Sequence, residues 1–378
     1  MTELKHCFPL VAKTILGLEE SLFKELEALG AEKLQLLNRA VSFEGNEGLI
    51  YRANYCCRTA LRILKPIHTF DLKKQDDLYD HVTAITWEDF IDADKTMAVD
   101  AVIHDSVFTN SQYVALKTKD AVVDRLRNLW GARPSINLDH PDLRIHIHIN
   151  KETCTVSLDS SGQSLHKRGY RQSTGQAPLN EVLAAGMVIL TGWDKRSPFI
   201  DPMCGSGTLP IEATMLAQNI PPGYFRKDFG FLSWKTFNPE LWNSVRESEN
   251  AKISRQALLI KGSDIAPRVI KAAGENIRFA GLQDVIKLEV CSFDKSVPFK
   301  EKGIILMNPP YDERMRLDDI ITFYKSIGDI LKKKYTGYDA WIISSDLNAL
   351  KFIGLHPSKK ITLFNGPLEC RLVKFQLY

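Results

Sequence analysis

The last two hundred residues alternate between short apolar runs and amphipathic stretches, and this alternation constrains the fold more than any other feature. Apolar runs lie at 199–200, 258–261, 285–290, 304–307 and 341–344, and helical stretches lie at 180–191, 207–218, 266–280 and 317–333. Such runs are typical of parallel strands buried on both faces. Two further runs, 361–364 and 372–377, flank Asn365-Gly366-Pro367 and predict an antiparallel hairpin at a sheet edge. The fold class expected is α/β, a doubly wound sheet with a C-terminal hairpin.

The first half of the chain has a mixed α+β pattern. In LRIHIHIN, residues 143–150, three isoleucines alternate with Arg144, His146 and His148. This basic face could contact RNA, but we favour an ordinary solvated face of an antiparallel sheet. The expected parts are an N-terminal piece over 1–45, a second α+β part over 46–158, a basic linker over 159–179 and a catalytic part over 180–378.

Composition excludes several classes of protein. The chain is 44% hydrophobic and 25% charged, and it lacks an apolar run long enough to span a membrane. Its first nine residues do not resemble a signal peptide, and its seven cysteines form no C-x-x-C pair. We therefore expect a cytoplasmic protein with reduced thiols, no metal and no membrane contact. The net charge of +3 is small, so a nucleic-acid surface has to be a local patch.

A basic stretch, SGQSLHKRGYRQSTGQAP, precedes the catalytic part. It carries Lys167, Arg168 and Arg171 around Tyr170. The stretch suits a solvated linker, and it equally suits an RNA contact in which the cations bind phosphates and the tyrosine stacks on a base. These four residues are the candidate RNA contacts.

The sequence DPMCGSGTLPIEA follows the first apolar run of the catalytic part. Gly205 and Gly207 allow close approach of the backbone to a ligand, and the helix that begins near Thr208 offers free N–H groups. A dinucleotide fingerprint needs a glycine where Pro210 stands, and the chain has no phosphate-cradling G-x-x-x-x-G-K-[ST] loop. A ligand without a pyrophosphate remains, and S-adenosylmethionine fits because Asp201 can hold the ammonium of its methionine end.

The next two runs end in KGSD and CSFD. Asp264 can accept hydrogen bonds from ribose hydroxyls, Phe293 can stack on adenine, and Asp294 can accept from the adenine amino group. Any one of these aspartates could be an ordinary helix N-cap, but three at successive strand ends favour a site. The candidate cofactor-binding residues are Asp201, Cys204, Gly205, Gly207, Thr208, Asp264, Ile265, Phe293, Asp294 and Asn308.

The fourth run ends in IILMNPPYDERM. The two prolines fix φ and force the residues before them into extended geometry, so the side chains of Asn308 and Tyr311 are held with little freedom, which suits either a stiff turn or a rigid site. Together with the strand-end acids, the motif resembles that of class I S-adenosylmethionine-dependent methyltransferases that modify exocyclic amino groups. The resemblance implies that Asn308 and the Pro309 carbonyl accept hydrogen bonds from the target amine, while Tyr311 stacks on the extruded base.

Six stretches narrow this resemblance. They are NSQYVALKTKDAVVDRL, HKRGYR, APLNEVLAA, DPMCGSGTLPIEA, NPPYDER and NGPLEC, and together they resemble the RlmL-type large-subunit rRNA guanine-N2 methyltransferases. The resemblance implies a ferredoxin-like piece at 1–45 and a THUMP RNA-binding domain at 46–158. It also implies N2-methylguanosine in 23S rRNA as the product, and 23S rRNA or a large-subunit assembly intermediate as the partner. Some members carry a second methyltransferase after this one, and its modification is not expected here.

Three features leave alternatives. The stretch NIPPGYFRKDFGFLSWKTFNPELW, residues 219–242, could cover the cofactor or touch RNA, but we favour a helical elaboration packed on the catalytic sheet. Cys204 and Cys291 could be nucleophiles, but an exocyclic amine is itself the nucleophile, so packing is favoured. A tRNA guanine-N2 methyltransferase is the next hypothesis, followed by a DNA adenine methylase. An inactive RNA-binding assembly factor is the alternative outside the enzymes.

Overall fold

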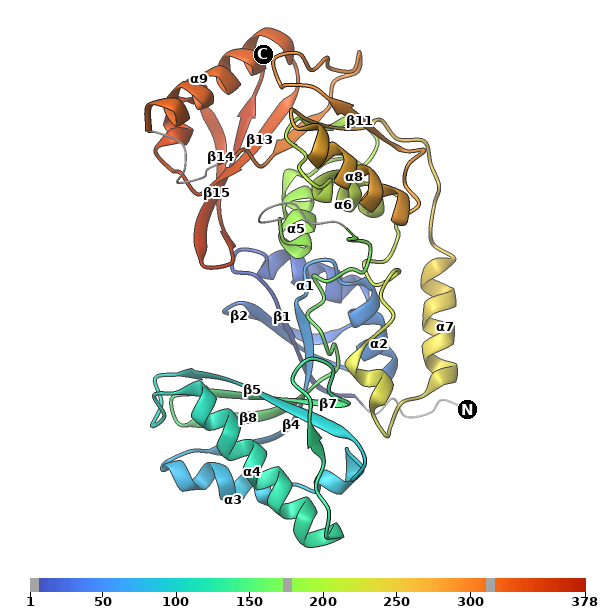
Figure 1. Cartoon of the computed structure of the whole chain (residues 1–378), viewed down its shortest axis with the longest axis vertical. Coiled ribbons are helices and arrows are strands. Elements are labelled where there is room, and N and C mark those ends of the chain that lie inside the picture. The colour runs from blue at the N-terminus through green and yellow to red at the C-terminus, as the bar shows by residue number, and fades with distance from the viewer. Residues whose placement is uncertain (1–6, 173–178, 311–316) are drawn as a thin grey trace. The chain divides into compact units, whose positions relative to one another are not determined.

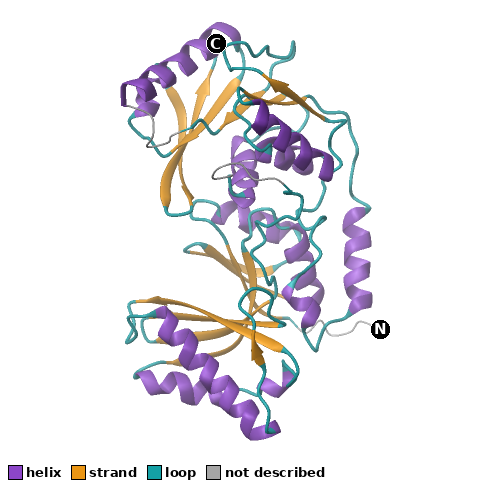
Figure 2. Cartoon of the chain, in the orientation of Figure 1, coloured by secondary structure: helices purple, strands orange, loops and turns teal. Residues whose placement is uncertain are grey.

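The computed structural model describes residues 7–172, 179–310 and 317–378, which form two compact units (Figures 1 and 2). Unit 1 contains the described residues of 1–14, 23–165 and 226–248, and unit 2 contains those of 15–22, 166–225 and 249–378. Each unit therefore includes a segment that is separated in sequence from the rest of that unit. Within the described ranges, no helix is long and apolar enough to cross a membrane.

Unit 1 is built on an eight-stranded sheet with the order β2-β3-β1-β4-β8-β7-β5-β6. The strands are β1 (Phe8–Lys13), β2 (Glu32–Leu37), β3 (Ala40–Gly45), β4 (Arg62–Asp71), β5 (Thr96–His104), β6 (Ser135–Ile136), β7 (Leu143–Asn150) and β8 (Thr153–Asp159). The helices are α1 (Glu19–Ala28), α2 (Glu47–Cys56), α3 (Gln75–Ala84), α4 (Ser111–Trp130) and α7 (Pro239–Asn250), with short 3₁₀ turns η1 (Trp87–Asp89) and η2 (Gly230–Ser233). The division between the units falls inside α1 and near the end of α7.

The alternation in β7 is confirmed on one face and corrected on the other. Ile145, Ile147 and Ile149 are fully buried, as the period of two requires. The opposite face is not simply solvated, because His146 is only 8% exposed.

Unit 2 contains the expected doubly wound sheet, with the order β11-β10-β9-β12-β13-β15-β14. The strands are β9 (Phe199–Asp201), β10 (Ile260–Asp264), β11 (Ile286–Val290), β12 (Ile304–Met307), β13 (Asp339–Ser344), β14 (Pro357–Asn365) and β15 (Leu368–Gln376). The helices are α5 (Glu181–Thr191), α6 (Thr208–Ala217), α8 (Pro267–Phe279) and α9 (Leu317–Lys334), with the 3₁₀ turn η3 (Ala349–Ile353). Strands β9 to β13 pair in parallel, and β14 and β15 form the antiparallel hairpin. The predicted fold class is confirmed.

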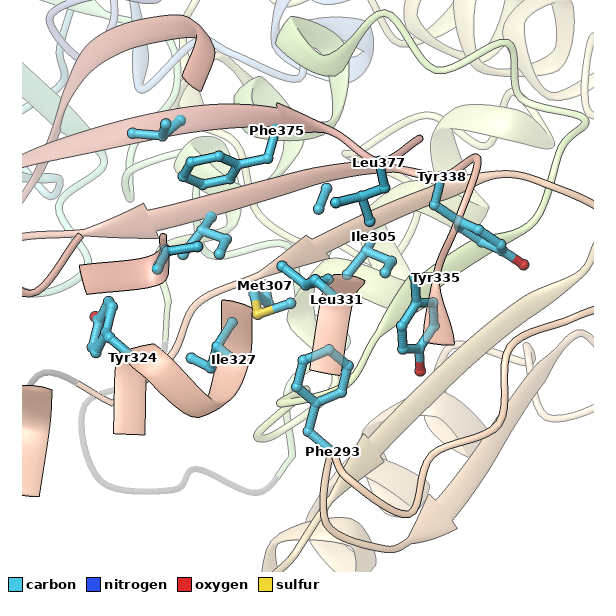
Figure 3. Packing of buried hydrophobic residues seen from close by; sticks show 14 of the residues in the cluster. Phe293, Ile305, Met307, Tyr324, Ile327, Leu331, Tyr335, Tyr338, Phe375 and Leu377 are labelled. Carbon is cyan, nitrogen blue, oxygen red and sulfur yellow. The ribbon is translucent and has the colours of Figure 1, made fainter. Parts of the chain in front are cut away.

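Residues of β12, β13, β15 and α9 form a hydrophobic cluster in unit 2 (Figure 3). Ile305 and Met307 of β12 contribute to it together with Ile327 and Leu331 of α9, and all four side chains are fully buried. Fixing β12 in this way also fixes the position of the residues that follow it. The cluster therefore positions Asn308.

Residues 226–248, which contain most of the stretch 219–242, correct the prediction for that stretch, whereas residues 219–225 belong to unit 2. Residues 226–248 belong to unit 1 rather than packing on the catalytic sheet. Phe231 and Trp242 surround the Tyr51 ring of α2, with centroids 4.5 and 6.0 Å away. The Arg226 guanidinium donates hydrogen bonds to the carbonyl oxygens of Ser161, Gln163 and Ser164 at 2.9 to 3.2 Å. An aromatic segment buries its rings wherever an apolar surface accepts them, and here that surface is on unit 1.

Candidate active site

The carboxyl ends of four adjacent parallel strands place the candidate residues along one edge of the unit 2 sheet. Asp201 ends β9 and pairs in register with Gly262 of β10, whose last residue is Asp264. Strand β12 also pairs with β9 in parallel, and Asn308 follows its last residue. The structure therefore brings Asp201, Asp264 and Asn308 to the edge where ligands of doubly wound sheets bind.

The glycine loop between β9 and α6 has two glycines with left-handed backbone, for different reasons. Gly205 has φ of 54°, and a Cβ built there would meet no atom within 4 Å. Gly207 has φ of 86°, and a Cβ there would approach the Ala273 side chain to 3.3 Å. Gly205 therefore presents open space in which a ligand can approach the backbone, whereas Gly207 allows α6 and α8 to pack closely.

Hydrogen bonds from neighbouring elements hold this loop. The Cys204 N–H donates to the Ser263 carbonyl at 2.9 Å, and the Gly205 N–H donates to Asp264 Oδ2 at 3.2 Å. Asp264 Oδ1 accepts from the Ala266 N–H at 3.0 Å. Each carboxylate oxygen of Asp264 retains a further lone pair, so it can also accept from a ligand hydroxyl.

Asn276 of α8 is a residue of this site that sequence reasoning missed. Its Nδ2 donates to the Ser206 carbonyl at 3.0 Å, and its Oδ1 accepts from the Gln172 N–H at 2.8 Å. The side chain is only 1% exposed. A useful indication was present in the sequence, because Asn276 falls on the apolar face of an amphipathic helix beside Ala273 and Ile277.

Burial dominates the electrostatics of the loop. Asp201 is 1% exposed, and its Oδ1 accepts from the Met203 N–H at 3.1 Å. Burial, with a smaller contribution from Asp264, raises the pKa of Asp201 well above its ordinary value. Burial likewise raises the pKa of the Cys204 thiol, which keeps it protonated and a poor nucleophile.

Asn308 presents a free acceptor at this edge. Its Oδ1 is buried, and it has no hydrogen-bond partner among the described residues. Pro309 is buried next to it. Tyr311 lies outside the described residues. Buried amide oxygens nearly always have a donor, so the orphaned oxygen of Asn308 indicates a ligand that supplies one.

The expected adenine contacts differ in exposure. Phe293 is 5% exposed, and its ring packs 5.5 Å from that of Tyr335 in the hydrophobic cluster (Figure 3). Little of that ring is left for a ligand. Ile265, in contrast, is 72% exposed directly after Asp264, whose carbonyl accepts from the Cys291 N–H at 3.1 Å. Ile265 is therefore the better apolar candidate.

Asp294, the other expected contact to adenine, is exposed. A hydrogen bond from Ser292 lowers the pKa of its carboxyl group. The Lys334 ammonium donates to its backbone carbonyl. Asp294 therefore presents an ionised acceptor to solvent.

Residues 166–172 of the basic stretch belong to unit 2, and the burial of Arg168 and Tyr170 corrects the interpretation as a solvated linker. Arg168 and Tyr170 are 2% and 1% exposed, and the Tyr170 hydroxyl donates to Glu212 Oε1 at 2.9 Å. Arg168 Nε lies 3.5 Å from the same carboxylate oxygen. Neither side chain can reach a phosphate in this structure. Lys167 is exposed, so its RNA contact stays a prediction.

Arg171 completes this support under the glycine loop. It pairs with Glu181 at 2.9 Å and donates to Thr208 Oγ1 at 3.1 Å, at the start of α6. The stretch thus brings Arg168 and Arg171 to the buried carboxylates of α6 and α5.

No group of three or more histidine, cysteine, aspartate or glutamate side chains in the described part of the chain could hold a metal ion.

Family models match three ranges of the chain. Residues 168–374 match the RMKL-like methyltransferase domain, residues 73–159 the THUMP domain, and residues 9–64 the RlmL ferredoxin-like domain. The ferredoxin-like match extends past residue 45, and the methyltransferase match begins before residue 180.

A curated relative and two solved structures are similar to the chain. The ribosomal RNA large subunit methyltransferase K/L of Syntrophotalea carbinolica is 38% identical over 374 residues, which are 96% of this chain and 52% of that protein. The chain thus spans about half the length of this relative. The structure of SMU.472 in complex with SAH is 32% identical, covers 99% of both chains and has a TM-score of 0.89. A predicted N6-adenine-specific DNA methylase from Listeria monocytogenes is 30% identical, covers 98% of this chain and 97% of that one, and has a TM-score of 0.86.

Proposed function

Since the chain belongs to the RMKL-like methyltransferase family, we propose that it transfers a methyl group from S-adenosylmethionine to the exocyclic N2 amine of a guanine in 23S rRNA. One observation carries the proposal: the buried Asn308 Oδ1 has no donor among the described residues and lies at the strand edge beside the glycine loop. The relative from Syntrophotalea carbinolica, named for large-subunit ribosomal RNA, supports the substrate.

The residues present fit the proposed cofactor. Gly205 leaves space for its close approach, Asp264 has lone pairs for the ribose hydroxyls, and the exposed Ile265 can cover one face of the adenine. Asp201 can pair with the ammonium of the methionine end. The similar structure of SMU.472, which contains SAH, supports this assignment.

The chemistry requires an acceptor such as Asn308. Bound S-adenosylmethionine supplies an electrophilic methyl group on a sulfonium. The guanine amine is a weak nucleophile because its lone pair is delocalised into the ring. Asn308 Oδ1 and the Pro309 carbonyl accept hydrogen bonds from its N–H groups, which aims the lone pair at the methyl carbon. Transfer would form the C–N bond as the sulfonium gives up its methyl group, and the amine would then lose a proton to solvent.

The RNA substrate also has to be bound, and we assign RNA binding to unit 1. The THUMP match lies entirely within it, and this part of the chain is where RNA would be bound. Guanine in a folded RNA has to leave its stack before its amine can reach the acceptor. We assign Tyr311 to stacking on the extruded base.

Replacing Asn308 tests the proposal. Asn308→Ala should lower the single-turnover rate by about 10²–10³, the usual cost of losing one preorganised acceptor. Affinities for S-adenosylmethionine and RNA should stay within a few-fold of wild type, since we assign Asn308 to the target amine rather than to cofactor binding. Asn308→Asp should retain part of the activity, because a carboxylate also accepts from the amine.

The assay is transfer of labelled methyl to 23S rRNA, with tRNA and DNA as competing substrates and a thermal melt to confirm folding. Near-normal turnover by a folded Asn308→Ala protein would show that the motif is only a stiff turn. Transfer to tRNA or DNA instead of 23S rRNA would reassign the substrate.

A further inference from the structure

One face of the unit 1 sheet gathers basic side chains from several strands. Lys13 of β1 is opposite Arg62 of β4, and His146 of β7 is opposite Ser157 of β8. Alternation along the paired strands puts these side chains on the face opposite Ile145, Ile147 and Ile149. We call the face that carries Lys13, His146 and His148 the histidine face.

Two acids on this face are already paired. Asp100 of β5 pairs with Arg144 at 2.7 Å, and Asp159 of β8 pairs with Arg62. Lys13 has no ion pair within the described ranges. Burial, with a smaller contribution from Arg39, lowers its pKa. Among the described residues, the ammonium of Lys13 is therefore a positive charge on the histidine face that no carboxylate pairs with.

His146 adds an unpartnered polar atom. Its side chain is 8% exposed, and its Nε2 is buried with no hydrogen-bond partner among the residues that the structure describes. Leaving such an atom unpaired is unfavourable, because it gives up its hydrogen bond to water without a replacement. A ligand that supplies a partner would remove this cost.

The two histidines on this face are held in their neutral forms. Burial and Lys13 are the main causes that lower the pKa of His146 to about 4, and Asp100 opposes them. Burial, Lys13 and His104 lower the pKa of His148. The charged or titratable groups that act on the two imidazoles are Lys13, Arg62, Asp100 and His104. Arg39 acts on Lys13, Arg144 pairs with Asp100, and Asp159 pairs with Arg62. Both histidines are mainly neutral at neutral pH, and a bound anion would favour their charged forms.

We propose that Lys13, His146 and His148 form a phosphate site that holds the backbone of the RNA substrate on unit 1. A phosphate can accept from the Lys13 ammonium and from both imidazoles. The positive charge of Lys13 disfavours a divalent cation as the ligand. His148 is half-buried and His104 is exposed, so the site opens to solvent at one side. The identity of the ligand as RNA rests on the proposed function.

The test uses the full chain and measures binding rather than methyl transfer. Lys13→Met and His148→Gln are compared with Lys24→Met, which removes an exposed lysine of α1. Affinity for a 23S rRNA fragment is measured by fluorescence anisotropy over a range of salt. Lys13→Met should weaken binding about tenfold and should reduce the slope of log Kd against log salt by about 1, the loss of one phosphate contact. Lys24→Met should leave both unchanged.

The affinity of the wild type should also rise as the pH is lowered from about 8 to about 6, because phosphate binding is coupled to proton uptake by the histidines. His148→Gln should reduce this dependence. The site would be overturned if the wild type binds RNA and both variants keep its salt slope and its pH dependence.

Inorganic phosphate separates this proposal from the proposed function. Imidazole NMR signals of His146 and His148 in the wild type should shift on addition of phosphate and not of chloride at equal ionic strength. Absence of a shift overturns the site even if a variant fails to fold. A shift with phosphate, combined with unchanged RNA binding in Lys13→Met, would assign the site to free phosphate instead of RNA.

Discussion

At the scale of single residues, the site separates groups that contact a ligand from groups that hold others in place. Asn308 presents an oxygen with no partner among the described residues, and Ile265 presents an exposed apolar surface. Both are features of residues that contact a ligand. Asp201 is different, because it is buried and its environment disfavours its charge. Its contribution to cofactor binding therefore depends on its protonation state.

The raised pKa of Asp201 predicts pH-dependent cofactor binding. In the free protein the carboxyl group keeps its proton up to a higher pH than usual, whereas pairing with an ammonium favours the ionised form. Binding of S-adenosylmethionine should therefore release a proton. Affinity is full above the raised pKa and decreases as the pH falls below it, by at most tenfold per pH unit.

Calorimetry in two buffers with different ionisation enthalpies counts the released proton. Asp201→Asn is the control, since it should bind more weakly and lose the pH dependence. Equal affinities for the wild type at mildly acidic and mildly alkaline pH would remove Asp201 from the cofactor site.

At the scale of elements, α8 acts as a support for the glycine loop. Asn276 links the loop at Ser206 to the chain at Gln172. Asn276→Ala removes both hydrogen bonds and leaves two backbone groups unpaired, at about 1–3 kcal/mol each. The dissociation constant of S-adenosylmethionine should rise about tenfold, and the melting temperature should fall.

A direct contact should behave differently from this support. Asp264→Ala should weaken cofactor binding at least tenfold, because it loses charge-assisted hydrogen bonds of about 1.5–3 kcal/mol each. Arg278→Ala, on the exposed side of α8, is the matched control.

Turnover at saturating cofactor should be near normal in Asn276→Ala. A loss of turnover that added cofactor cannot rescue would contradict a purely positioning role for Asn276.

The elements also show what a sequence can and cannot predict. The edge with Asp201, Asp264 and Asn308 could be predicted, because parallel strands bring their carboxyl ends together whatever their order in the chain. The burial of Arg168 and Tyr170 against Glu212 could not be predicted. Their partner Glu212 is more than forty residues away in the sequence, and local composition does not show that the fold will bring a buried carboxylate to them.

At the scale of the whole molecule, the two units do not follow the order of the sequence. Residues 15–22 belong to unit 2, where Leu18 packs closely on Gly186 of α5. Residues 226–248 belong to unit 1 and supply buried aromatic rings, among them Phe231 and Trp242. A cut at the end of the basic stretch therefore does not release a complete RNA-binding part.

This exchange predicts the behaviour of truncated chains. A fragment of residues 1–175 lacks Phe231 and Trp242 and should unfold at a lower temperature than the full chain, with weak RNA binding as a result. Joining 226–248 to residue 165 through a flexible linker should restore both properties. The measurements are thermal melting followed by circular dichroism and RNA binding by anisotropy. A fragment 1–175 as stable as the rejoined form would show that the aromatic segment contributes little.

The same exchange sets a delay during protein synthesis. The ribosome has made all other residues of unit 1 once it reaches residue 165. The core of unit 1 also needs the segment that ends at residue 248, and the ribosome reaches that residue 83 residues later. At about 5–20 residues per second, a ribosome needs about 4–17 s to make them. During that interval the apolar surface around Tyr51 is uncovered on the nascent chain, where a chaperone can bind it or a neighbouring chain can aggregate with it.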